Sequence, residues 1–100
     1  MIKHIVFFNF KDGACGATKA ENMAKAKEML LNLMGKVPAL RSMSAGPNAV
    51  EGACAWDFAL VAEFDTVEAL KHYVEHPAHK AVSSFMSQVR TERASVDFEF

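Results

Sequence analysis

The chain has 100 residues, of which 51% are hydrophobic, and a formal net charge of −1, which suits one folded domain over residues 1–100. Its 11 basic and 12 acidic residues are interspersed, without the clustered basic surface that nucleic-acid binding needs. No apolar stretch approaches the ~20 residues of a membrane span, and no secretory signal opens the chain. We therefore expect a cytoplasmic protein whose partners are neither nucleic acid nor a membrane.

The first half of the chain predicts a strand, a helix and a second strand. Residues Ile2 to Phe10 are rich in β-branched and aromatic side chains, as in a strand. After a loop, Thr18 and Glu21 have the spacing of a capping box, which begins a helix. Gly35, followed by a proline, predicts the helix end. A weaker strand is predicted from Leu40 to Ala45.

The second half predicts a strand, an interrupted helix and a final strand. The third strand is expected at about Trp56 to Phe64. Asp65 or Thr66 then caps a short helix. Pro77 must interrupt this helix, because its ring disfavours helical geometry at the residue before it. A longer helical stripe follows, and the chain closes with a strand from Ala94 to Phe100.

This order of elements predicts an α+β protomer of the ferredoxin-like βαββαβ type with an extra helix. Right-handed crossovers place the first and third strands in the middle of a four-stranded antiparallel sheet. Helices cover one face of such a sheet, so Ile5, Phe7 and Val61 would form an exposed apolar patch on the other. We therefore predict a homodimer in which two sheets close face to face around a shared interior.

Several segments match the pattern of one known family. The most specific runs from Tyr73 to His79 with the form Tyr-x-x-His-Pro-x-His, preceded by Phe64-Asp65-Thr66 to Leu70. Supporting segments are Ile2–Val6, Val37–Leu40, Gly46–Asn48 and Val96–Phe98. Nearly the whole chain thus resembles the stress-response A/B barrel (Dabb) family. The resemblance implies ferredoxin-like protomers that pair into a dimeric α+β barrel.

The resemblance also implies candidate site residues. The family includes stress-induced proteins of unknown activity, larger stable assemblies and a plant polyketide cyclase, olivetolic acid cyclase. That enzyme closes a ring by a cofactor-free aldol reaction that uses a His and a Tyr. These residues align with His79 and Tyr73, and a further pocket histidine aligns with His4.

The chemistry of these side chains supports the same assignment. A neutral imidazole can remove a proton from a carbon beside a carbonyl, and a phenol can hydrogen-bond the resulting enolate. His79 would then be the base and Tyr73 the oxyanion donor, in an apolar pocket on the His4 face of the sheet. Structural roles are the alternative: His79 begins a helix, Tyr73 packs on the sheet with its hydroxyl on a backbone group, and His4 is a hydrogen-bonded core residue.

The sequence predicts neither a metal nor a cofactor. His72, His76 and His79 have a spacing that can gather imidazoles on a helix, but Pro77 redirects the chain among them, and His76 suits a helix end. Some relatives hold a cation through backbone carbonyls after the first helix, and the resemblance places these at Met34, Val37 and Leu40.

The two cysteines, Cys15 and Cys54, fit no metal or redox spacing and are expected to be free thiols. The loops that carry them nevertheless lie at the same end of the predicted sheet, so topology alone does not forbid a disulfide.

Three functions remain open at this point. The first is a dimeric barrel that binds a small, largely apolar ligand. The second is a cofactor-independent cyclase or lyase-like enzyme that uses His79 and Tyr73, and the third is a structural or assembly protein with a vestigial pocket. A cavity that joins His4, Tyr73 and His79 favours the first two, and a filled core favours the third. Heme-degrading or quinol-oxidising activity rests on fold analogy alone.

Overall fold

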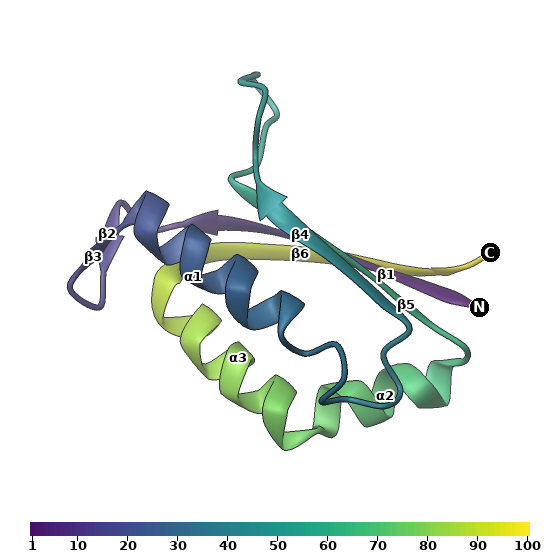
Figure 1. Cartoon of the computed structure of the whole chain (residues 1–100). Helices are drawn as coiled ribbons and strands as arrows, with labels where there is room; N and C mark the ends of the chain where they lie inside the picture. Colours follow the sequence, from purple (N-terminus) through teal and green to yellow (C-terminus); the bar gives the residue numbers. More distant parts are fainter.

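A four-stranded antiparallel sheet carries three helices on one face in the computed structural model, which describes all 100 residues (Figure 1). The long strands are β1 (Ile2–Phe10), β4 (Ser42–Pro47), β5 (Phe58–Phe64) and β6 (Arg90–Glu99). The helices are α1 (Lys19–Leu31), α2 (Val67–Glu75) and α3 (Pro77–Val89). The strand order β4-β5-β1-β6 confirms that the first and third predicted strands are central. None of the helices has the length and apolar character needed to cross a membrane.

Helix α1 begins as predicted and ends early. The Thr18 hydroxyl accepts a hydrogen bond from the Glu21 amide at 3.1 Å, and the Glu21 carboxylate accepts one from the Thr18 amide at 2.9 Å. The regular helix stops at Leu31, whereas the sequence predicted its end at Gly35. The chain continues in turns up to Gly35, whose φ of +86° is a conformation that glycine adopts without steric cost.

A small hairpin, β2 (Gly13–Ala14) and β3 (Ala17–Thr18), replaces the simple loop predicted after the first strand. Cys15 and Gly16 both have positive φ, at 54° and 72°, as a tight hairpin turn requires. The buried side chain of Asn22 donates to the Ala14 carbonyl at 3.0 Å and fastens the hairpin to α1. Both cysteines are exposed free thiols, as expected.

The last strand begins at Arg90, four residues earlier than the predicted start at Ala94. The segment from Arg90 to Arg93 is polar because β6 is an edge strand, so the apolar alternation that reveals a strand starts only beyond it. It nevertheless pairs with β1, with a register shift between Asn9 and Phe10. A smaller difference affects β4, which begins at Ser42 rather than Leu40.

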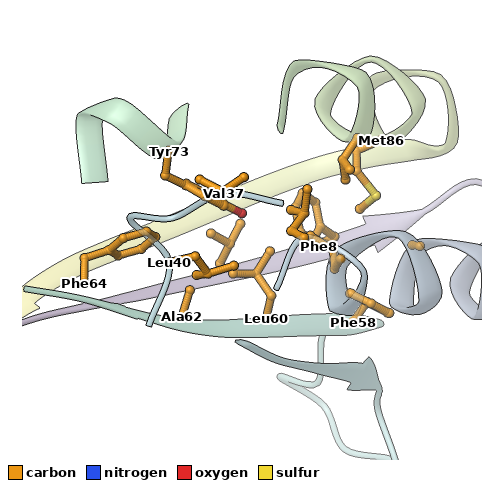
Figure 2. Packing of buried hydrophobic residues seen from close by; sticks show 14 of the residues in the cluster. Phe8, Val37, Leu40, Phe58, Leu60, Ala62, Phe64, Tyr73 and Met86 are labelled. Atoms are coloured by element: carbon orange, nitrogen blue, oxygen red, sulfur yellow. The ribbon is translucent and has the colours of Figure 1, made fainter. Parts of the chain in front are cut away.

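The helix-covered face of the sheet holds the core (Figure 2). Alternate residues of β1 and β5 point to this face, because successive side chains of a strand lie on opposite sides. Aromatic rings from β1 and β5 pack against one another there, with the Phe10 and Phe58 ring centroids 5.6 Å apart. The helices contribute Leu30, Tyr73 and Met86 among others.

The opposite face of the sheet, here called the open face, has no helix over it (Figure 1). Its apolar residues are Ile5, Phe7, Val61, Val96 and Phe98, which the strand registers place on one side. Phe7 is 40% exposed and Val96 51% exposed. The apolar patch predicted from the sequence is therefore present, and β6 enlarges it.

The loop between β4 and β5 stands away from the sheet on the side opposite the helices (Figure 1). Trp56 lies at its base, with its ring centroid 6.4 Å from that of Phe7. Trp56 therefore borders the open face.

Candidate functional site

A cavity of about 90 Å³ lies between the sheet and the helices, and it joins His4, Tyr73 and His79. One water needs roughly 10–15 Å³, so the space exceeds that of a single water several-fold. The apolar part of its wall is formed by Val6, Phe8, Leu30, Leu60, Val82 and Met86. The polar lining groups are His4, Tyr73, His79, Ser83, Arg90 and Arg93.

Tyr73 lies at the centre of this arrangement. Helix α2, which carries it, begins at Thr66, whose hydroxyl accepts a hydrogen bond from the Ala69 amide at 3.1 Å. The Tyr73 ring is 4.9 Å from the Phe64 ring and 4.4 Å from the His79 ring, between centroids. Tyr73 therefore packs over the sheet, as expected if it has a structural role.

The Tyr73 hydroxyl makes no hydrogen bond within the chain, so it does not bind a backbone group. It points into the space between the helices and the sheet (Figure 2). Burial raises the pKa of Tyr73 to about 12, because the phenolate would lose its hydration. The phenol thus stays protonated near neutral pH and remains a hydrogen-bond donor to whatever fills the cavity.

The break between α2 and α3 explains how His79 is held. In a continuous helix the Ala78 amide would bond to the Val74 carbonyl. Here it donates instead to Nδ1 of His76, at 3.0 Å, and Pro77 has no amide hydrogen to offer. The Val74 carbonyl is left to accept a hydrogen bond from Nδ1 of His79 at 3.1 Å. The His76 side chain therefore caps the start of α3, while its backbone amide donates to the Tyr73 carbonyl at 3.2 Å at the end of α2.

This hydrogen bond fixes the tautomer of His79. A carbonyl only accepts hydrogen bonds, so Nδ1 carries the proton and Nε2 of the neutral ring keeps its lone pair. Burial lowers the pKa of His79 below its usual 6.5. The hydrogen bond to Val74 raises this pKa in part, and the nearby His4 and Arg93 lower it. The neutral ring is therefore the main form at neutral pH.

His4 is buried and lines the same cavity. The strand register places it directly opposite Asp97 of β6, and its Nδ1 is hydrogen-bonded to the Asp97 carboxylate. Its ring centroid lies 6.3 Å from that of Tyr73. His4 is thus both a hydrogen-bonded core residue and a neighbour of the other two candidates, and its Nε2 is left without a protein partner.

Sequence reasoning missed Asp97 and the cavity-lining Ser83, Arg90 and Arg93. Asp97 alternates with apolar residues and looks like a solvent-facing residue of an edge strand. The sequence signal was available, since the apolar residues of this strand occupy the open face and leave its polar residues facing the helices.

The three histidines considered for a metal do not converge with other ligating side chains into a cluster. His76 and His79 have the backbone partners described above, and His72 is exposed on α2.

Solved structures of other proteins share the fold of this chain. A dimeric protein of unknown function from Bacteroides fragilis, described as having a ferredoxin-like fold, is 33% identical with a TM-score of 0.87 and coverage of 99% of this chain and 95% of that one. A hydroxynitrile lyase from Passiflora edulis is 14% identical with a TM-score of 0.81, over 97% and 90% of the two chains. The chain is thus a ferredoxin-like α+β domain of a kind found in dimers.

The family follows from the sequence match. The model of the Stress responsive A/B Barrel Domain family matches residues 2–100, and the chain belongs to this family. An uncharacterised protein of Streptomyces coelicolor is 34% identical over the full length of both chains.

Proposed function

We propose that this protein binds a small, largely apolar carbonyl compound in the cavity and moves a proton on it without a cofactor. His79 acts as the base and Tyr73 as the hydrogen-bond donor to the developing oxyanion. The observation that carries the proposal is the pairing of His79 and Tyr73 in one cavity wall, with ring centroids 4.4 Å apart. The Val74 carbonyl holds the neutral His79 ring in the tautomer whose Nε2 has the lone pair, and the Tyr73 hydroxyl makes no hydrogen bond within the chain.

The proton transfer follows from these positions. Nε2 of His79 takes a proton from the carbon beside the carbonyl, and the electron pair moves onto the carbonyl oxygen. The Tyr73 hydroxyl stabilises that oxygen by a hydrogen bond that strengthens as the negative charge grows. The enolate then either takes the proton back or attacks a second carbonyl of the same molecule. In the second case the proton passes from His79 to the new alkoxide, as in a cyclase.

The cavity supports this proposal over a purely structural role. A protein with a vestigial pocket would fill the space between Phe8, Tyr73 and Met86 with side chains. The Tyr73 hydroxyl makes no hydrogen bond within the chain, so a ligand oxygen in the cavity could accept one from it.

Hydrogen–deuterium exchange tests the chemistry. Acetophenone and a series of small methyl ketones are incubated with the protein in deuterium oxide, and loss of the methyl proton signal is followed by NMR. We expect the protein to accelerate exchange, His79→Asn to lower the rate by about 10²–10⁴-fold, and Tyr73→Phe to lower it by about 10²-fold. His72→Asn, which changes an exposed histidine outside the cavity, serves as the control. Exchange at the buffer rate for every ketone would contradict the proposal.

We further propose that a second copy of the chain covers the open face. Phe7, Val96 and Phe98 are each at least 39% exposed in the protomer, so together they leave a continuous apolar surface in water. Two such faces are self-complementary under two-fold symmetry. The neighbour from Bacteroides fragilis is described as dimeric, which supports self-association of this fold.

A further inference from the structure

Arg90 and Arg93 reach the cavity side of the sheet by an irregularity in β6. Arg93 lies opposite the buried Phe8, which faces the helices. In a regular strand a residue three positions away would face the other side. The register shift between Asn9 and Phe10 adds one residue to β6, so that Arg90 lies opposite the buried Phe10 and faces the helices too. β-bulges re-aim side chains in this way, often beside functional sites.

Neither arginine has a carboxylate partner. The ion pairs of the protein involve other residues, and the one polar contact of Arg93 is with the Ser95 hydroxyl at 3.5 Å. The two nearest acidic side chains along β6 are already engaged: Asp97 binds His4, and Glu92 accepts from Asn9 on the open face. Two positive charges therefore line a cavity that has no carboxylate among its lining residues.

We propose that the ligand of this cavity carries a carboxylate, which binds Arg90 and Arg93 while its apolar part contacts Phe8 and Val82. A guanidinium presents paired donors that match the two oxygens of a carboxylate. The inference rests on the proposed function and specifies its substrate class as small organic acids with a carbonyl group.

The location of the arginines favours this class. Arg93 and Ser83 are exposed whereas Val6 and Met86 are buried, so the arginine side of the cavity is its open side. The charged group of an acid would remain near water there, with its apolar body inside. Arg90 is the C-cap residue of α3, where the helix dipole adds partial negative charge. A monoanionic carboxylate is therefore favoured over a phosphate dianion.

The electrostatics of the neighbouring groups agree with this placement. The positive charge of Arg93 opposes the burial-driven rise in the pKa of Tyr73 and adds to the burial-driven lowering of the pKa of His79. The guanidinium therefore acts on both groups. An enolate formed beside them would be stabilised by the same charge.

Phenylacetate and phenylacetamide form a matched pair of probes that differ in charge. Their binding is measured by NMR titration of the ¹⁵N-labelled protein, with inorganic phosphate as a competitor. We expect phenylacetate to bind about tenfold more tightly than the amide, and phosphate not to displace it. Arg93→Gln and Arg90→Gln should each remove most of this preference without weakening amide binding. Lys36→Gln, which removes one positive charge from the turn after α1, should leave it unchanged.

Several results would overturn the inference. These are equal binding of the two probes, an unchanged preference in both arginine variants, displacement by phosphate, and no binding of either probe at about 20 mM. The His79→Asn variant separates the two proposals, because it lacks the base but keeps both arginines. Acid binding by this variant, together with an absence of ketone exchange in the wild type, would refute the proton transfer and leave the carboxylate site standing.

Discussion

His4 and Asp97 lie opposite each other on β1 and β6, and the imidazole of the first donates a hydrogen bond to the carboxylate of the second. The carboxylate accepts only, so the His4 proton is on Nδ1 and the lone pair of the neutral ring is on Nε2. Asp97 thus sets the tautomer of a histidine in the cavity wall without lining the cavity itself.

Asp97→Ala should release this tautomer. With no acceptor beside Nδ1, the neutral His4 ring is expected to populate both tautomers, which ¹⁵N chemical shifts of labelled histidine distinguish. Loss of the hydrogen bond should also lower the free energy of unfolding by about 1 kcal/mol. Glu99→Ala removes an exposed acid two residues further along β6 and is the matched control. A His4 spectrum that is identical in the wild type and in Asp97→Ala would contradict this prediction.

Tyr73 is the sole tyrosine of the chain, so phenolate absorbance reports on it alone. Burial raises its pKa to about 12 in the folded protein, whereas the unfolded chain should titrate near the ordinary value of 10.0. The folded state therefore holds its proton more tightly, and stability should fall as the pH rises from about 10 towards 12, by on the order of 2–3 kcal/mol. Absorbance titrations in buffer and in urea measure both values. A folded midpoint near 10 would show that the hydroxyl is not buried.

His79 titrates in the opposite sense. Burial lowers its pKa below 6.5, so the base form persists at lower pH than for a free histidine. The rate of ketone exchange should rise with pH through this lowered pKa and then reach a plateau. The unfolded chain takes up the proton more readily, so the free energy of unfolding should decrease as the pH falls below 6.5 towards the folded value. His79→Asn should remove this decrease, and a midpoint at or above 6.5 in the His79 NMR titration would contradict the prediction.

Phe7→Glu should dissociate the proposed dimer. A carboxylate in the open face would lose its hydration on association, so sedimentation should show a monomer at concentrations where the wild type is dimeric. Val67→Glu is the matched control, because Val67 is similarly exposed, at 43% against 40% for Phe7, but lies on α2. Trp56, the single tryptophan, borders the open face, and its fluorescence should shift to longer wavelength on dissociation. A wild-type monomer at micromolar concentration would refute the dimer.

The sequence predicted the arrangement of the sheet because its first and third strands carry apolar residues on both faces. Apolar residues on both sides of Ile5–Phe8 require a central position, and the structure confirms it. Pro77 equally predicted a helix break next to His79. The hydrogen bond between His79 and the Val74 carbonyl could not be predicted. It depends on the Ala78 amide donating to His76 instead of to Val74.

The position of Arg90 in the cavity wall and the pairing of Asp97 with His4 could not be predicted, for two physical reasons. Arg90 belongs to β6 through a bulge, and a bulge leaves no periodic signal in a polar edge strand. Asp97 pairs with His4 across a register that a single sequence does not determine. Helix ends such as Leu31 also depend on local turns rather than on the positions of glycine and proline.

Neighbouring residues of β1 face the two proposed binding events, ligand binding on one side of the sheet and self-association on the other. His4 faces the cavity, and its neighbour Ile5 faces the surface proposed for a second copy. By thermodynamic linkage, if self-association changes the affinity for the ligand by some factor, the ligand changes the association constant of the two copies by the same factor. The coupling free energy can therefore be measured in two ways: as the change in ligand affinity on dilution of the protein, or as the change in self-association at ligand saturation.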